Sequence, residues 1–221
     1  MEGMARRGFL RSALWVLLAF AGAPLFSWPQ TQYVQPPAKE YIPLLEDPHR
    51  IGRLQPDKII SALALKPGDV VADIGSGSGL FTRLLAKRVL PRGWVFAVDI
   101  DPELLEHVAR TSREEGIANF TTILGREDSP GLPPQSVDLV FICDTLHHIQ
   151  SRQAYLSNVK AVLKPGGRLA ILDFEKNWPA GHETLRFSLQ DLQQWIAAAG
   201  YRKLGEYNFI PDNFFHIYMA R

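Results

Sequence analysis

The sequence has little cysteine and no clear excess of either charge. Cys143 is the single cysteine among 221 residues, which excludes an internal disulfide and a structural zinc site built from cysteines. The chain carries 24 Lys and Arg against 23 Asp and Glu, so its formal net charge is +1. Nucleic-acid-binding domains usually carry clustered positive charge, and we therefore expect no nucleic-acid partner.

The sequence also lacks the composition of a disordered chain, which combines low hydrophobicity with high net charge. Hydrophobic residues make up 46% of it. The length and this composition suit one globular domain with a short additional segment.

Residues 1–29 are arranged like a targeting segment. The pair Arg6-Arg7 precedes an uncharged stretch, residues 12–28, with a short apolar core, and the run RRGFLR resembles the bacterial twin-arginine export signal. The stretch is short for a bilayer span, which takes roughly 20 residues. We expect a signal peptide or a membrane anchor, and hence a bacterial protein that is exported or attached to the membrane through residues 9–28. The alternative is an incorrectly assigned start, with which the protein stays in the cytoplasm.

Residues 30–55 are rich in proline and show no sustained periodicity, so we predict a linker or an irregular leading segment. The aromatic Tyr33 and Tyr41 and the pair Leu44-Leu45 indicate that part of it docks on the domain. A lid over an active site is the alternative.

Strand and helix patterns alternate within residues 56–221, which we expect to form the main domain. Several strands lack polar alternation, as strands buried on both faces do. Strand–helix–strand repeats require a parallel sheet with helices on both sides. Asp57, Asp101 and Ser188 are expected to cap the amino ends of three helices. The expected parallel strands are 69–74, 94–98, 120–124, 137–142 and 169–174.

Two more strands, 204–210 and 213–220, flank Pro211-Asp212 and leave no room for a crossover helix. They must form a hairpin, so one strand runs antiparallel to the rest. The predicted fold is α/β: a Rossmann-like doubly wound sheet of about seven strands, mostly parallel, with a C-terminal antiparallel hairpin.

A glycine-rich loop, DIGSGSG from Asp73 to Gly79, follows the first strand and opens a helix. Glycines there let the backbone turn sharply and approach a ligand. A dinucleotide-binding loop needs its third glycine at position 80, which is Leu80 here, and an acid ahead of the glycines repels phosphate. Asp99, at the end of the next strand, is placed to accept hydrogen bonds from ribose hydroxyls. We therefore predict a ligand with a ribose and a positive or zwitterionic tail, without a diphosphate.

These features resemble the class I S-adenosylmethionine-dependent methyltransferases over about residues 54 to 221. The terminal hairpin matches the sheet of that family, in which one strand inserts antiparallel. Each matching segment is unspecific alone, but four in the right order make a specific match. The resemblance implies S-adenosyl-L-methionine as the cofactor and methyl transfer as the reaction. The segments are VADIGSGSG, AVDIDPELL, GLPPQSVDLVFICDTLHHI and LKPGGRLAILDF.

The resemblance also implies a cofactor site along the carboxyl edge of the sheet. Asp99 is expected to bind the ribose hydroxyls, with Ile100 beside the adenine. Arg126 stands where the family often has an acid, which leaves Glu127 and Asp128 as joint candidates for binding the adenine amino group, Asp128 being slightly preferred. The expected lining of the methionine and ribose portion is Asp73, Gly75, Ser76, Gly77, Gly79 and, through its backbone, Cys143, whose thiol we interpret as a small buried hydrophobe.

Polar residues near the carboxyl ends of the fourth and fifth strands are the candidates for catalysis. Methyl transfer needs an aligned nucleophile, with a base when that nucleophile must lose a proton. His147, His148 and Asp144 are the candidate bases, with Glu175 as a rival. His182, in a loop over the active-site edge, is a candidate contact of the substrate. One of the paired histidines is expected to be structural and the other to face the pocket. Consecutive residues rarely ligate one ion, so no metal is expected.

We expect a small-molecule acceptor, because the DTLHHI and ILDF segments are most similar to quinone- and lipid-methylating members of the family. Protein substrates stay open. A nucleic-acid methyltransferase is expected to show an (N/D)PPY-type tetrad after the fourth strand, where this chain has CDTL. An export signal disagrees with a cofactor made in the cytosol, so the alternative function is an exported S-adenosylmethionine-binding protein or pseudoenzyme without turnover. A sugar-nucleotide or nicotinamide enzyme is a third interpretation.

Overall fold

The computed structural model describes residues 33–221, and the predictions for residues 1–29 lie outside the described residues. The strands are β1 (Val70–Ile74), β2 (Trp94–Asp99), β3 (Phe120–Leu124), β4 (Val137–Cys143), β5 (Leu163–Phe174), β6 (Tyr201–Tyr207) and β7 (Asn213–Ala220). The helices are α1 (Ala38–Leu45), α2 (Pro48–Leu54), α3 (Pro56–Ala62), α4 (Leu80–Val89), α5 (Pro102–Glu114), α6 (Arg152–Val162) and α7 (Leu189–Ala198), with a 3-10 turn η1 (Leu146–His148).

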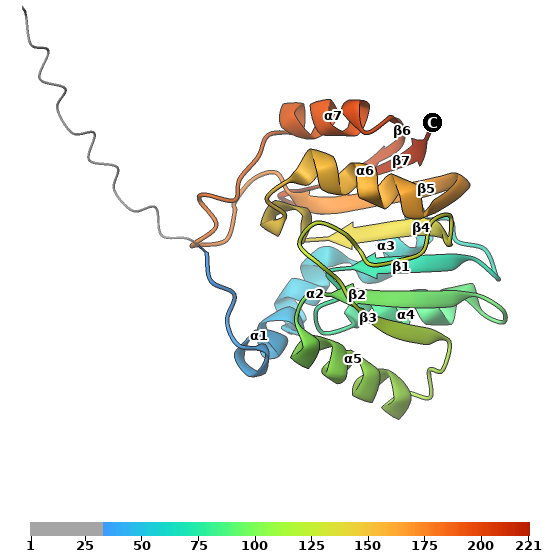
Figure 1. Cartoon of the computed structure of the whole chain (residues 1–221). Coiled ribbons are helices and arrows are strands. Elements are labelled where there is room, and N and C mark those ends of the chain that lie inside the picture. Colours follow the sequence, from blue (N-terminus) through green and yellow to red (C-terminus); the bar gives the residue numbers. More distant parts are fainter. Residues whose placement is uncertain (1–32) are drawn as a thin grey trace, which may run out of the picture. The chain divides into compact units, whose positions relative to one another are not determined.

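The strands form a single seven-stranded sheet in the order β3-β2-β1-β4-β5-β7-β6 (Figure 1). The first five strands pair in parallel, whereas β7 runs antiparallel to both β5 and β6. The prediction of a mostly parallel sheet with a C-terminal antiparallel hairpin is confirmed. The direction of winding reverses between β1 and β4, and ligands of open α/β sheets bind beyond the carboxyl ends of the strands at such a point.

The core lies on both faces of the sheet. Helices α3 and α4 cover one face and α6 and α7 cover the other (Figure 1). Val71 and Val140, in the two central strands, are fully buried, as the uninterrupted hydrophobic runs predict. This double layer leaves the carboxyl edge of the sheet as the place where polar side chains gather.

Two of the three predicted helix caps are confirmed. The Asp101 carboxylate accepts a hydrogen bond from the backbone N–H of Glu103, and Ser188 forms a capping box with Asp191. The prediction for Asp57 is wrong, because α3 begins at Pro56. Proline at the first helical position has a preset φ and no N–H to satisfy, so the helix begins two residues earlier than a cap at Asp57 implies.

The leading segment, residues 30–55, was predicted to be a linker or an irregular segment, and regular structure forms within it. Two short helices, α1 and α2, occupy most of it, and α2 is capped by Asp47, whose carboxylate accepts from the N–H groups of His49 and Arg50. Neither helix is long enough to be stable alone. Both lie over the carboxyl edge of the sheet, which agrees with the predicted docking and places them where the alternative, a lid, would be.

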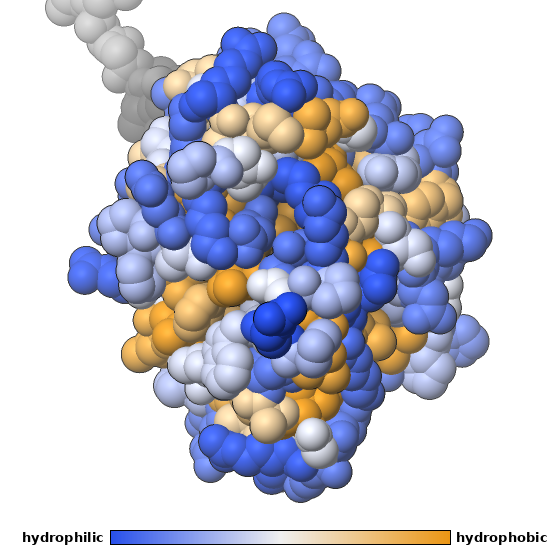
Figure 2. All heavy atoms as spheres, turned by 90° about the vertical axis from the view of Figure 1, so that its right-hand side faces the viewer, coloured by the Kyte–Doolittle hydropathy of each residue, from blue (hydrophilic) through white to orange (hydrophobic). Residues whose placement is uncertain are grey.

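Figure 2 shows the side of the molecule where the parallel strands begin, on which hydrophilic and hydrophobic residues are interspersed. Within residues 33–221, no helix combines the length and the hydropathy needed to cross a bilayer.

Candidate active site

The carboxyl ends of β1, β2 and β4 open into a cavity of about 940 Å³. The glycine loop after β1 lines it, together with Asp99 after β2 and the segment Asp144–His148 after β4. Helices α1 and α2 contribute Tyr41 and Arg50 to its wall. Because β2 and β5 lie on opposite sides of the β1–β4 pair, the cavity has one end near β2 and β3 and another near β4 and β5.

The glycine loop is tied to the neighbouring strand. The N–H groups of Gly75 and Ser76 both donate to the carbonyl of Val98, at 2.8 and 3.0 Å. A Cβ at Gly75 would collide with the side chain of Thr145, and Gly77 has a φ of 53°, in the left-handed region that favours glycine. The sequence therefore needs glycine at both positions to form this turn.

Asp99 ends β2 with its carboxylate in the cavity wall. One oxygen accepts from the N–H of Gly77 at 2.9 Å and the other from the N–H of Asp101 at 3.1 Å. Burial raises the pKa of Asp99, and these N–H groups oppose the rise. Each carboxylate oxygen keeps a second lone pair for a ribose hydroxyl. Asp99 thus both holds the loop in place and faces the ligand space.

Asp73 is almost completely buried beneath the glycine loop. Its carboxylate accepts a hydrogen bond of 2.6 Å from the hydroxyl of Thr82. Burial raises the pKa of Asp73 to about 7, against the lowering effect of that hydroxyl. A cationic ligand group close to Asp73 would favour its ionised form, as the sequence interpretation requires.

The residues expected around the adenine lie at the β2–β3 end. Ile100 lines the cavity and is more than half exposed, so its apolar side chain is accessible to a ligand ring. Glu127 and Asp128 also line it and are both exposed. Asp128 is paired with Arg126 at 3.2 Å, whereas Glu127 has no ion pair within residues 33–221. Both Glu127 and Asp128 therefore line the cavity, and both stay candidates for binding the adenine amino group.

Two further residues support the fit of S-adenosylmethionine to this end. The hydroxyl of Ser76 is buried and has no hydrogen-bond partner within residues 33–221, so a ligand group can satisfy it. Burial raises the pKa of the Cys143 thiol well above its usual value, which agrees with its interpretation as a buried hydrophobe. The glycine loop, Ser76 and Asp99 together offer hydrogen bonds to a ligand, and the carboxylates of Asp73 and Asp99 beside the loop would repel a diphosphate.

Asp144, one of the candidate bases, is paired instead. Its carboxylate binds the guanidinium of Arg50 at 2.9 Å and accepts from the amide of Asn213 at 3.1 Å. Asn213 in turn accepts a hydrogen bond from Arg53. Burial raises the pKa of Asp144, with Arg50 opposing the rise. Asp144 therefore connects α2 to the sheet. The rival base, Glu175, is exposed and does not line the cavity.

His147 is held by a carboxylate that the sequence interpretation did not single out. Its Nδ1 lies 2.7 Å from Oδ1 of Asp173, and its backbone N–H donates to Oδ2 at 3.1 Å. Both side chains are almost fully buried. An ionised carboxylate can only accept, so in the neutral ring beside it Nδ1 would carry the hydrogen and Nε2 the lone pair. That Nε2 is buried and has no partner within residues 33–221.

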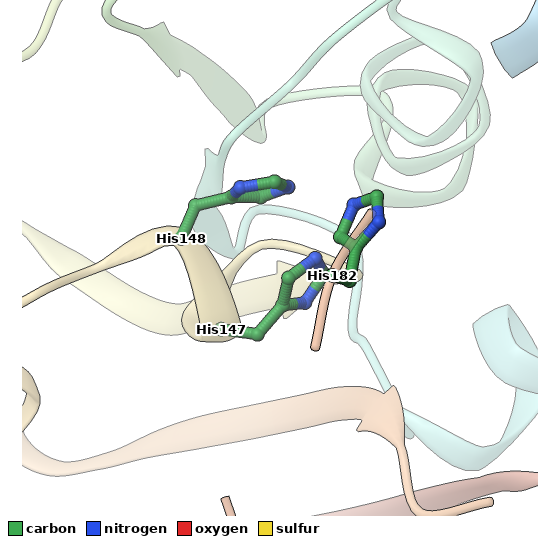
Figure 3. Close-up of side chains that lie close together, drawn as sticks. All are labelled: His147, His148 and His182. Carbon is green, nitrogen blue, oxygen red and sulfur yellow. The ribbon is translucent and has the colours of Figure 1, made fainter. Parts of the chain in front are cut away.

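Three histidines meet at this end of the cavity (Figure 3). His147 and His148 come from the η1 turn, and His182 comes from the β5–α7 connection. One ring nitrogen from each lies within 4.8 Å of the others. Burial lowers the pKa of His148 to about 3, so its ring is neutral at neutral pH. The ring of Tyr33 packs on His148 and His182, with centroid distances of 4.8 and 4.3 Å.

Sequence reasoning missed Asp173, Arg50, Arg53 and Asn213 as parts of this site. Asp173 is the penultimate residue of β5 and follows its hydrophobic run, and an acid at the end of a buried strand was a usable signal. Arg50 and Arg53 share one face of a helix that was not predicted, so no pattern pointed to them. The expected pocket-facing histidine and its structural neighbour are both cavity residues here.

Comparison with known proteins agrees with this geometry. Residues 72–171 match a family described as "Methyltransferase domain". A solved structure, a SAM-dependent methyltransferase from Aquifex aeolicus, superposes with a TM-score of 0.77 at 26% identity, covering 85% of this chain and 100% of that one.

Two curated relatives carry the name "Ubiquinone/menaquinone biosynthesis C-methyltransferase UbiE". The protein of Cupriavidus pinatubonensis is 28% identical over 66% of this chain and 63% of its own length. That of Hydrogenovibrio crunogenus is 32% identical over 57% of this chain and 50% of its own length. The chain therefore spans about half to three fifths of the curated relatives it matches.

The family match covers the glycine loop, Asp99 and the segment after β4, and the Aquifex aeolicus structure superposes on most of this chain. The third interpretation, a sugar-nucleotide or nicotinamide enzyme, fits neither the glycine spacing of the loop nor the family that residues 72–171 match. The chain contains a class I S-adenosylmethionine-dependent methyltransferase domain, with S-adenosyl-L-methionine as its cofactor.

Proposed function

We propose that this protein transfers a methyl group from S-adenosylmethionine to a small cyclic acceptor that carries a hydroxyl group. The observation that carries the proposal is the Asp173–His147 pair. It leaves Nε2 of His147 without a hydrogen-bond partner within residues 33–221, and His147 lines the same cavity as the cofactor-binding loop. A methyltransferase with an unactivated acceptor needs such a group beside the cofactor.

The β2–β3 end of the cavity would hold the cofactor. Asp99 would bind the ribose hydroxyls, Ile100 would pack on the adenine, and Asp73 and Ser76 would face the methionine portion. When bound, S-adenosylmethionine supplies an electrophilic methyl group on a sulfonium. The chain has only to exclude water and to orient the acceptor for attack on it.

The β4–β5 end would hold the acceptor. His147 accepts a proton from the acceptor hydroxyl at Nε2, and Asp173 fixes the ring and stabilises the resulting positive charge. The rings of Tyr33 and Phe174, which line the cavity there, offer apolar surface to a flat molecule. Loss of the hydroxyl proton makes an aromatic ring carbon, or the oxygen itself, a stronger nucleophile.

The acceptor class that we would test first is a quinol ring lacking one methyl group. The named relatives are C-methyltransferases of ubiquinone and menaquinone biosynthesis. An aromatic hydroxyl beside a histidine base suits the same chemistry. The small-molecule expectation from the sequence agrees with a cavity of this size.

The test uses the full chain with methyl-labelled S-adenosylmethionine and demethylated quinols. We expect label in the quinol, and a rate lowered about a hundredfold or more by His147→Ala and by Asp173→Asn, since a general base contributes roughly 10²–10⁴-fold. Affinity for S-adenosylhomocysteine should stay within about twofold in both variants. His49→Ala, an exposed histidine of α2 outside the cavity, is the matched control.

Wild-type rates in the His147→Ala variant would contradict the role of the base. Tight binding of S-adenosylhomocysteine with no transfer to any quinol would instead support a cofactor-binding protein without turnover.

A further inference from the structure

The three histidines at the acceptor end have the chemistry of a metal site. Their ligand nitrogens lie within 4.8 Å of one another, and Figure 3 shows the rings gathered around one small space. A chance cluster of surface histidines would be hydrated, but His147 is 1% exposed and its Nε2 has no partner within residues 33–221. A buried, unpaired nitrogen acceptor pointing into a cluster of imidazoles is what a metal ion would satisfy.

The carboxylate of Asp173, which contacts His147, is a second feature typical of metal sites. Ligating histidines commonly donate their other ring N–H to a carboxylate, which fixes the tautomer and makes the free nitrogen more basic. Asp173 does this to Nδ1 of His147 at 2.7 Å. His182 directs its Nδ1 to the carbonyl of Ala180 at 3.2 Å, which leaves its Nε2 as the ligand atom.

The sequence led us to expect no metal, because consecutive residues rarely ligate one ion, but the η1 turn brings the ring centroids of His147 and His148 to 4.1 Å. We propose that His147, His148 and His182 bind one divalent transition-metal ion of the Zn²⁺ class. Neutral imidazoles suit Zn²⁺, Cu²⁺, Ni²⁺ and Co²⁺ more than Mg²⁺ or Ca²⁺, which prefer oxygen ligands. An ion about 2.0–2.1 Å from each nitrogen draws the three rings closer together. The loop that carries His182 has no regular secondary structure, so this approach requires no helix or strand to shift.

Metal binding has a consequence for the proposed reaction, and this part rests on the proposed function. The ion occupies the lone pair of His147 Nε2 that would otherwise accept the acceptor's proton. A metal-loaded enzyme therefore has no free base at this place, and the ion inhibits methyl transfer reversibly.

The test uses the full chain, produced without a polyhistidine tag and freed of metal with a chelator. Co²⁺ is the probe because its visible absorption reports the ligand set. We expect one Co²⁺ per chain, with a dissociation constant below about 10 µM, displaced by Zn²⁺. Asp173→Asn should weaken binding about 10–100-fold, as loss of a carboxylate behind a ligand does. His182→Ala should weaken it at least as much, and His49→Ala should leave it unchanged.

His182→Ala is the decisive variant because its side chain lies in a loop, where truncation leaves the core intact. Binding of S-adenosylhomocysteine by each variant verifies that it is folded. No Co²⁺ binding at about 100 µM, or equal binding by the wild type and His182→Ala, overturns the proposal. Where methyl transfer is measured, Zn²⁺ should lower the wild-type rate at least tenfold and a chelator should restore it. Metal binding without any methyl transfer would reject the proposed function and leave the metal site standing.

Discussion

Arg50 and Asp144 join the leading helices to the sheet through an ion pair of 2.9 Å between Nη2 and Oδ2. The same guanidinium donates to the carbonyl of Leu45 at 2.9 Å, so it also fixes the end of α1. Leu45 lies against the glycine loop, where a Cβ on Gly77 would approach its side chain to 2.9 Å. A single arginine therefore links the end of β4, both leading helices and the cofactor loop.

Arg50→Ala should destabilise the protein and weaken cofactor binding together. Removing one partner of a largely buried ion pair leaves Asp144 uncompensated, which costs about 3 kcal/mol. Urea unfolding measures that loss, and calorimetry with S-adenosylhomocysteine measures the affinity. Arg110→Ala, which removes an exposed pair with Glu114, is the control and should cost less than about 0.5 kcal/mol. An Arg50→Ala variant as stable as this control would show that the leading helices are held by other contacts.

Asp99→Ala should lower the affinity for S-adenosylhomocysteine about ten- to a hundredfold, because two charge-assisted hydrogen bonds to the ribose are worth roughly 1.5–3 kcal/mol each before water compensates. It should also lower thermal stability modestly, since Asp99 accepts from the N–H groups of Gly77 and Asp101 without ligand. Asp99→Asn should lose less affinity, because its amide oxygen still accepts.

Asp101→Ala separates the two roles of Asp99. It removes the cap of α5, which costs about 1 kcal/mol of stability, and leaves the ribose contact in place. A drop in affinity after Asp101→Ala equal to that after Asp99→Ala would mean that loop position, and not the carboxylate contact, determines binding.

Asp73 makes the stability of the ligand-free protein depend on pH. Its pKa of about 7 lies above its ordinary value of 3.8, so the fold favours the protonated carboxyl. The stabilisation is complete below pH of about 4 and is lost as pH rises toward 7 and above. Asp73→Asn cannot ionise, so its free energy of unfolding should exceed that of the wild type at pH 8 by more than at pH 5.

Urea unfolding at several pH values measures this difference, and other titrating groups cancel between the two proteins. Thr82→Val is the matched variant, because the lost hydroxyl had lowered the pKa of Asp73. The loss of stability should then extend to higher pH than in the wild type. Parallel pH profiles for the wild type and Asp73→Asn would contradict the raised pKa. At pH 8 the Asp73→Asn variant should also bind S-adenosylmethionine more weakly, because a cationic ligand group favours the carboxylate.

For the amino-terminal segment we propose export or membrane attachment, with the Arg6-Arg7 pair as the twin-arginine signature. Replacing both arginines by lysine keeps the charge and removes that signature. A reporter fused to the carboxyl end of the full chain should then be retained in the cytoplasm. A reporter that reaches the same compartment as before would rule out twin-arginine export and favour simple anchoring by residues 9–28.

The parallel sheet could be predicted because its signal is local. Uninterrupted apolar runs such as WVFAV in β2 mark strands buried on both faces, and the short connection of β6 to β7, residues 208–212, forces the antiparallel hairpin. The meeting of the glycine loop and Asp99 at one cavity was predictable for the same reason: Asp73 to Gly79 is one continuous loop, and Asp99 ends the next strand. The start of β6 could not be predicted, because Tyr201 already pairs with Ala220 of the neighbouring strand β7, three residues before the expected strand begins at residue 204.

The acceptor end could be predicted only in part, because its geometry is not local. His147 and Asp173 are 26 residues apart in sequence and meet only through the β4–β5 pairing. Helices α1 and α2 have weak local signals, with Pro43 inside α1, and depend on tertiary contacts such as Arg50 to Asp144.

The insertion of β7 between β5 and β6 sets an order on synthesis. While the ribosome makes the chain, β5 has an open edge with unpaired backbone groups until residues 213–220 have emerged, and β6 has no neighbour to join before then. Exposed edges of this kind invite pairing with other chains. The nascent protein should therefore depend on a chaperone, or on rapid completion, more than a fold whose strands are added in spatial order.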